Sequence, residues 1–261
     1  MDVLDFAEAY GPVALVTGAS SGIGKAFAEA LAARRLDLVL VARRIERLEA
    51  LAATLSRDHG IRTRALQVDL ADPLASQAIL EATRSLDIGL VVSNAGFGMK
   101  GEHAANDSSA MADMVMVNCT VPMQLAHGFI PRLRARKRGG LILTASVEGL
   151  IGCPYSAAYA ATKALVVSLG EALWAELRPD GIDVLTLCPG ATESEAAERQ
   201  GIDLSKLQNV MSADDVVRLT MENIRKGPTF ISSDHYRASF DRLLAMPRRD
   251  ALMAMAGAMK R

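Results

Sequence analysis

Three side chains in the second half of the sequence have the types and spacing needed to move a proton. Tyr159 is followed four residues later by Lys163, and Ser146 lies thirteen positions before Tyr159. A free tyrosine, with a pKa of about 10, is a poor base at neutral pH. Because residues four apart share one helix face, we expect the charge of Lys163 to favour the phenolate of Tyr159. Ser146 follows a predicted strand, where its hydroxyl can hold a substrate oxygen beside Tyr159.

A glycine-rich segment near the start of the chain is typical of a dinucleotide-binding turn. Residues 17–24 read Thr-Gly-Ala-Ser-Ser-Gly-Ile-Gly and lie between an apolar run at 13–16 and an apolar-periodic stretch at 23–31. Glycines let the backbone approach a pyrophosphate, whose charge is stabilised by the free amides and the dipole at a helix start. The expected cofactor contacts in this turn are Gly18, Ser20, Ser21, Gly22, Ile23 and Gly24.

Together these segments resemble the classical short-chain dehydrogenase/reductase family, from about Val13 to Ile231. The glycine spacing matches the family's TGxxxGxG, and Asn118 and the run Ser93-Asn94-Ala95-Gly96 add to the match. The resemblance implies that Tyr159 is the acid/base, that Lys163 tunes it and bonds the nicotinamide ribose, and that Ser146 holds the carbonyl. Asn118 would organise a water beside the lysine. The alternatives are that Tyr159 is a core residue and Asn118 an ordinary polar residue of a helix.

The resemblance also implies further cofactor contacts. Asp69 should touch the adenine amino group with Leu70 packed beside it, while Asn94, Ala95 and Gly96 should line the adenosine side. The pair Pro189-Gly190 resembles the turn below the nicotinamide, and Thr192 would reach the carboxamide or the pyrophosphate. A plain turn at the end of a strand would have the same sequence.

The residue after the second predicted strand selects between NAD and NADP in this fold. A carboxylate there accepts hydrogen bonds from the ribose hydroxyls of NAD and repels the 2′-phosphate of NADP. This chain reads Val41-Ala42-Arg43-Arg44, with two guanidinium groups and no acid. Arg43 can make a bidentate contact with a phosphate, so the sequence favours NADP(H), with Arg43 and Arg44 as contacts. The alternative is that both arginines are solvated surface residues.

Strand-like and helix-like segments alternate along the chain, which predicts an α/β fold. We expect a single doubly wound Rossmann-type domain over residues 1–261, with a central parallel sheet of about seven strands and helices on both faces. The predicted strands are 13–16, 36–41, 64–68, 89–92, 141–145, 183–187 and 229–231. The longest helices are expected at 108–138 and 155–177. Both helices are apolar on more than one side, which favours a homodimer or homotetramer.

Composition excludes several classes of protein. The 261 residues carry a net charge of −1, and only 4% are aromatic, so no basic stripe with stacking aromatics indicates nucleic-acid binding. Cys119, Cys153 and Cys188 are odd in number, as expected for reduced thiols, and the scattered histidines offer no metal spacing. With no signal-like N-terminus and no run of about eighteen apolar residues, we expect a cytoplasmic protein without a membrane span.

The substrate is the least determined feature. The pocket should be framed by residues 148–155, with Tyr155 as a wall, and by a variable loop at 191–207 that begins with Glu193, Glu195 and Glu198. A basic cluster at 132–138 either receives an acidic carrier protein or complements a helix dipole. The helical tail at 235–261 carries Met246, Met253, Met255 and Met259 among basic residues that include Lys260. It is expected to be a pocket lid, a subunit contact or a membrane-surface helix.

These observations lead to one main expectation and two alternatives. The main expectation is an NADP(H)-dependent oxidoreductase that transfers a hydride between nicotinamide and a small-molecule carbonyl or secondary alcohol. The first alternative is a 3-oxoacyl-[acyl-carrier-protein] reductase. The second is a non-catalytic NADP(H)-binding regulatory protein, although a pure binder has no physical need for a proton donor.

Overall fold

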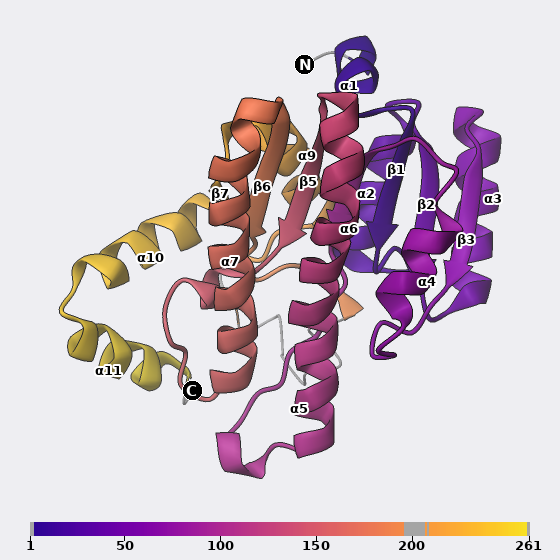
Figure 1. Ribbon diagram of the computed structural model, residues 1–261. Coiled ribbons are helices and arrows are strands. Elements are labelled where there is room, and N and C mark those ends of the chain that lie inside the picture. Colours follow the sequence, from indigo (N-terminus) through magenta and orange to yellow (C-terminus); the bar gives the residue numbers. More distant parts are fainter. Residues whose placement is uncertain (1–2, 196–206, 208, 260–261) are drawn as a thin grey trace.

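A seven-stranded parallel sheet forms the centre of the molecule (Figure 1). The computed structural model describes residues 3–195, 207 and 209–259. The strand order is β3-β2-β1-β4-β5-β6-β7, so the direction of winding reverses between β1 and β4. The strands are β1 Val13–Thr17, β2 Asp37–Ala42, β3 Thr63–Gln67, β4 Ile88–Ser93, β5 Gly139–Thr144, β6 Ile182–Cys188 and β7 Thr229–Ile231.

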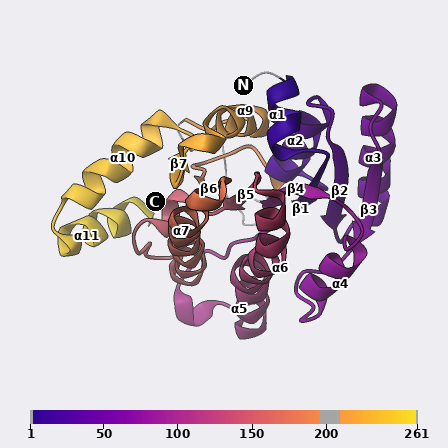
Figure 2. The same cartoon turned by 45° about the horizontal axis from the view of Figure 1, so that its top comes forward.

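Helices cover both faces of the sheet (Figure 2). One layer contains α1, α2, α3 and α9, and the other contains α4, α5, α6 and α7. Alternate residues of β1 pack into different cores: Ala14 and Val16 contact the first layer, while Val13 and Leu15 contact the second. The helices are α1 Val3–Tyr10, α2 Gly22–Ala32, α3 Ile45–His59, α4 Ala75–Ala82, α5 Ser108–Val115, α6 Val121–Arg136, α7 Ala157–Leu177, α9 Ala213–Asn223, α10 Asp234–Ala245 and α11 Arg248–Met259.

The doubly wound α/β fold and its seven predicted strands are confirmed, with ends that differ by at most two residues. The strands were predictable because β1, β4 and β5 are buried along their whole length, as parallel strands covered on both faces are. Short 3₁₀ turns occur at His103–Ala105, Val147–Gly149, Arg178–Asp180 and Ile224–Lys226.

The two long helices differ from their predictions at positions that bear on the site. The helix expected at 108–138 is interrupted by a π turn, Met116–Thr120, which joins α5 to α6. The helix expected to begin at 155 begins at Ala157, because Tyr155 has a φ of 59°, in the left-handed region. A single 3.6-residue period does not reveal either local change.

The tail after β7 forms α10 and α11, which extend beyond that edge of the sheet (Figures 1 and 2). Most of the predicted 191–207 loop, Glu198 included, lies outside the described residues, as does Lys260. No helix among the described residues is long and apolar enough to cross a membrane.

Candidate active site

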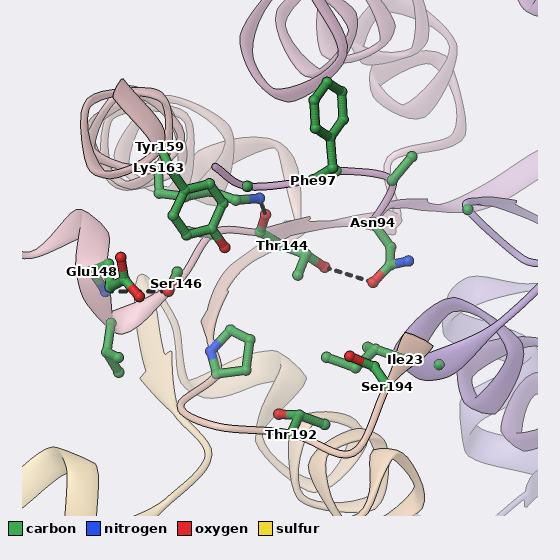
Figure 3. Close-up of a pocket in the computed structure, with 18 of the residues that line it drawn as sticks. Ile23, Asn94, Phe97, Thr144, Ser146, Glu148, Tyr159, Lys163, Thr192 and Ser194 are labelled. Atoms are coloured by element: carbon green, nitrogen blue, oxygen red, sulfur yellow. Dashed lines mark hydrogen bonds between the residues drawn. The ribbon is translucent and has the colours of Figure 1, made fainter. Parts of the chain in front are cut away.

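One large cavity lies at the carboxyl edge of the sheet and joins the two groups of residues singled out in the sequence. Its volume is about 1390 Å³, and its lining includes the glycine-rich turn after β1 and the catalytic candidates Ser146, Tyr159 and Lys163. Open α/β sheets bind ligands at this edge, beside the point where the winding reverses. Figure 3 shows Tyr159, Lys163 and Ser146 on one side of the space and Ile23 and Ser194 on the other.

The glycine-rich turn fits a dinucleotide because a side chain at its glycine positions would be strained or would clash with the backbone. Gly18 and Gly22 have φ values of 69° and 51°, which favour glycine. A Cβ at Gly24 would lie 2.2 Å from the Gly18 carbonyl oxygen and 2.6 Å from Nδ2 of Asn94. The backbone at the start of α2 can therefore approach a pyrophosphate closely.

Thr17 connects this turn to the segment after β4. Its buried hydroxyl accepts hydrogen bonds from the backbone amides of Asn94, at 3.0 Å, and Ala95, at 3.1 Å. Nδ2 of Asn94 donates to the Thr17 carbonyl at 3.2 Å. The expected contacts Asn94, Ala95 and Gly96 all line the cavity.

The other expected adenosine contacts also line the cavity. Asp69 is exposed and Leu70 is buried. Arg43 is exposed beside them. Arg44 is half-buried, and its Nη2 donates to the hydroxyls of Ser20 and Ser21, both at 3.0 Å.

The proton-transfer candidates converge from two elements. Ser146 follows β5, and its buried Oγ accepts a hydrogen bond from the backbone amide of Glu148 at 3.2 Å. Tyr159 lies in the first turn of α7 and is half-buried. Interaction with the Ser146 hydroxyl lowers the pKa of Tyr159, and both side chains line the same cavity.

The net pKa shift of Tyr159 is opposite to the expected one. Burial of the phenol raises its pKa, the charge of Glu148 raises it further, and the hydrogen bond with Ser146 only partly opposes them. Nζ of Lys163 lies 5.7 Å from the centre of the Tyr159 ring. The net pKa of this phenol is therefore raised and not lowered as expected, and Tyr159 is protonated at neutral pH.

Lys163 is itself strongly affected by its surroundings. It is 4% exposed, and its Nζ donates to the carbonyl oxygen of Thr144, at the end of β5, at 2.8 Å. Burial lowers the pKa of Lys163 to about 8. A charge that is costly to bury and that lies in a cavity marks a candidate functional group.

Asn118 lies beside Lys163, within the π turn. Its amide exchanges two hydrogen bonds with the backbone of Phe97, at 2.9 and 3.1 Å, and donates a third to Thr162 at 3.0 Å. A Cβ at Gly96 would lie 3.0 Å from Oδ1 of Asn118 and 3.1 Å from Nζ of Lys163. Glycine at position 96 thus lets the amide and the ammonium share one small space. π turns are frequent at functional sites for such local adjustments.

The turn after β6 closes the cavity opposite the catalytic helix. Pro189, Gly190 and Thr192 all line it. Gly190 packs directly on α10, because a Cβ there would lie 2.2 Å from the ring of Tyr236. The hydroxyl of Thr192 donates to the Gly190 carbonyl at 3.1 Å.

Comparison with known proteins places this arrangement in a family. The model of the short chain dehydrogenase family matches residues 12–204. The chain belongs to the short-chain dehydrogenase family. Its core is a nucleotide-binding Rossmann fold, and the protein is an oxidoreductase that acts on CH–OH groups.

Relatives that match nearly the whole chain include a hydroxysteroid dehydrogenase and an alcohol dehydrogenase named for bulky ketones. A 7beta-hydroxysteroid dehydrogenase of Clostridium sardiniense is 32% identical over 98% of both chains. A short-chain dehydrogenase from Sphingobium yanoikuyae in complex with NADPH is 36% identical, with a TM-score of 0.83 over 94% of this chain and 96% of that one. The bulky-bulky ketone specific alcohol dehydrogenase from Comamonas testosteroni is 31% identical, with a TM-score of 0.79 over 94% of each chain.

One ion pair of this short-chain dehydrogenase lies in the cavity but has no obvious signal in the sequence. Nζ of Lys100 lies 2.6 Å from Oε1 of Glu148 and donates to the hydroxyl of Ser156 at 3.2 Å. The same ammonium lies 5.8 Å from the centre of the Tyr159 ring. Lys100 and Glu148 are 48 residues apart, so only the folded structure shows that they meet.

The two tail helices of this short-chain dehydrogenase form an apolar wall of the cavity. Tyr236, Phe240 and Leu243 project from α10, and Met255 and Met259 from α11. Tyr155 lines the cavity as expected. Of the predicted roles of the tail, this placement agrees with a cover over the pocket.

The basic cluster lies at the other end of the sheet from the cavity. The cluster spans the end of α6 and the residues just before β5, whereas Ser146 follows the carboxyl end of β5 (Figure 1). Arg132 donates to two backbone carbonyls, Arg134 pairs with Asp180, and Arg136 pairs with Asp87. Most of the cluster therefore stabilises the fold. No group of residues that could hold a metal ion occurs among those described, and all three cysteines are buried and free.

Proposed function

We propose that this protein is an NADP(H)-dependent reductase of bulky, largely apolar ketones, and that it runs in reverse as a secondary-alcohol dehydrogenase. The observation that carries the proposal is the convergence of Ser146, Tyr159 and Lys163 in one cavity with the glycine-rich turn. When bound, the nicotinamide supplies the hydride. The protein must then hold the carbonyl and deliver one proton to its oxygen.

The protonation state of Tyr159 supports the reductive direction. Because burial raises its pKa, the phenol carries its proton at neutral pH and can donate it to the oxygen of a carbonyl that is being reduced. The Ser146 hydroxyl holds that oxygen by a hydrogen bond. The Lys163 ammonium beside the ring stabilises the phenolate that remains, and Asn118 fixes the backbone of Phe97 next to it.

The size and lining of the cavity support a bulky substrate. Its volume of about 1390 Å³ exceeds the roughly 300–1,000 Å³ of common ligand sites, so it has room for a dinucleotide together with a large second molecule. Phe240, Leu243 and Met255 offer this molecule an apolar surface. The steroid and bulky-ketone relatives agree with this class.

The choice of NADP(H) depends on Arg43 and Arg44. Solved neighbours include complexes with NADPH and with NAD, so the family as a whole uses either cofactor. In this chain an exposed guanidinium, Arg43, lines the cavity where an NAD enzyme of this fold carries an acid. The guanidinium of Arg44 and the hydroxyls of Ser20 and Ser21 lie next to it and suit a phosphate.

A screen of carbonyl compounds, followed at the NADPH absorbance, tests the proposal. We expect turnover of bulky ketones with NADPH, a lower affinity for NADH, and loss of that difference in Arg43→Ala. Equal affinities of the wild type for the two cofactors would remove the Arg43 argument. The screen should include a 3-oxoacyl thioester, the alternative substrate class. Its turnover together with failure of all bulky ketones would replace the proposed substrate.

We also infer that the protein is a homodimer or homotetramer in the cytoplasm. The continuous helix formed by α5, the π turn and α6 leaves large apolar side chains exposed, with Val115 at 48% and Met123 at 40%. Helices that expose apolar surface commonly bury it against another subunit. Light scattering after gel filtration tests the inference, and a monomer at micromolar concentration contradicts it.

A further inference from the structure

A carboxylate forms an ion pair with the guanidinium of Arg44, one of the two arginines that we assign to the cofactor phosphate. Oε2 of Glu195 lies 2.7 Å from Nη1 of Arg44, and its other oxygen pairs with Arg47. The second nitrogen of the same Arg44 fork donates to Ser20 and Ser21 of the glycine-rich turn. Glu195 belongs to the segment after β6, 151 residues away from Arg44 in the sequence.

Backbone contacts hold the segment that carries Glu195. The backbone amide of Glu193 donates to the Met211 carbonyl at 2.9 Å, and the Met211 amide donates to the Ala191 carbonyl at 3.0 Å. Close to Glu195, the side chain of Ser194 packs on the glycine-rich turn, 3.2 Å from where a Cβ of Gly22 would lie. These contacts direct the acidic side chain toward the start of α3.

We propose that Glu195 is an internal competitor for the 2′-phosphate of NADP(H) at Arg44 and thereby weakens the preference for the phosphorylated cofactor. The inference rests on the proposed function, in which Arg43 and Arg44 bind that phosphate. A planar guanidinium binds carboxylates and phosphates through the same donors, so the two anions compete for Nη1 of Arg44. A carboxylate that stays nearby also repels the phosphate.

The competition acts on specificity and not on cofactor binding in general. NAD(H) has no 2′-phosphate, so Glu195 can keep its ion pairs when NAD(H) binds. NADP(H) must break one pair or accept repulsion, which lowers the difference between the two affinities. Because Glu195 and Arg44 are each about one-third exposed, at 34% and 33%, water screens the pair. We therefore expect an effect of about two- to fivefold.

The test measures dissociation constants of NADPH and NADH, without substrate, for the wild type, Glu195→Gln and Glu193→Gln. Glu193 provides a matched control, since it is an exposed glutamate of the same segment. Glu195→Gln should bind NADPH about two- to fivefold more tightly and NADH as before, and Glu193→Gln should change neither affinity. Adenosine 2′,5′-bisphosphate and 5′-AMP, which differ only in the 2′-phosphate, should repeat the pattern. Circular dichroism confirms that each variant is folded.

The outcomes separate this inference from the proposed function. If the wild type binds NADPH and Glu195→Gln binds it no more tightly than Glu193→Gln does, only the role of Glu195 is contradicted. Weaker binding of NADPH by Glu195→Gln also overturns it, because the carboxylate would then be orienting Arg44 for the phosphate. If the wild type binds neither dinucleotide, the proposed function and this inference fail together.

Discussion

The helix that carries Tyr159 and Lys163 approaches the sheet through Gly170, and a single added methyl group there should displace it. A Cβ at position 170 would lie 1.8 Å from Oγ1 of Thr186 in β6, whereas ordinary contacts begin at 3.4 Å. One side must therefore yield by about 1.6 Å, and the side chain of Thr186 is fully buried and stiff at χ1. Overpacking usually costs about 1–3 kcal/mol, and this large overlap favours the upper part of that range, about 2–3 kcal/mol, against about 1 kcal/mol gained from alanine's helix propensity.

We expect Gly170→Ala to lower the free energy of unfolding by about 1–2 kcal/mol and kcat by at least about tenfold. The loss of kcat follows because misplacement of a catalytic group by about 1 Å can cost up to about a hundredfold in rate. Urea denaturation and steady-state kinetics on the same preparation measure the two effects. Each effect should be largely reversed by the second substitution Thr186→Ala.

The second substitution makes the reasoning refutable. The Thr186 hydroxyl has no hydrogen-bond partner among the described residues, so Thr186→Ala removes a costly buried group along with a methyl and should itself change stability by less than about 1 kcal/mol. In the double variant the nearest remaining atom of residue 186 is its Cβ, at 3.1 Å. A coupling of about 2 kcal/mol between the sites is expected. Additive effects, or a Gly170→Ala protein as stable as the wild type, would refute the close contact.

Three further changes probe the cavity. Gly96→Ala should push Asn118 and Lys163 apart and lower kcat about tenfold with little loss of stability. The control Gly257→Ala, whose added Cβ would meet no atom within 4 Å, should leave kcat unchanged. Equal kinetics in the two variants contradict this prediction. Since the pKa of Lys163 is lowered to about 8 in the folded protein, the unfolded chain binds more protons than the folded one above that pH. The free energy of unfolding, measured relative to Lys163→Met, should therefore rise between pH 7 and 9 by at most about 1.4 kcal/mol per pH unit. A difference that stays constant with pH in urea titrations refutes this prediction. Met255→Ala should raise KM for bulky ketones more than for small ones, and equal changes would remove the apolar wall from the account.

The sequence predicted the elements and residues whose signals are local. Apolar runs marked the central strands β1, β4 and β5, which are buried because helices cover the sheet on both faces. The glycine spacing predicted a turn in which Gly24 leaves no room for a side chain, and the four-residue interval placed Tyr159 and Lys163 on one helix face. The register of α7 on the sheet then brought them to Ser146 in one cavity.

The features that the sequence did not predict depend on contacts between distant segments. Lys100 meets Glu148 and Arg44 meets Glu195 across 48 and 151 residues, respectively, and no periodic pattern indicates such pairs. The direction of the Tyr159 pKa shift was missed for the same reason. Spacing alone indicated a neighbouring ammonium, but the burial of the phenol and the charge of Glu148 arise only on folding.

The substitution Tyr159→Phe tests most directly the central claim, that the Tyr159 phenol donates the proton to the carbonyl oxygen. Tyr159→Phe removes one oxygen from the cavity and keeps the ring, so the glycine-rich turn and the Arg43 region should stay intact. The account predicts that turnover of a ketone identified by the screen falls at least about a thousandfold, while the dissociation constant of NADPH changes less than about twofold. Turnover that survives the substitution would show that another group supplies the proton and would contradict the mechanism.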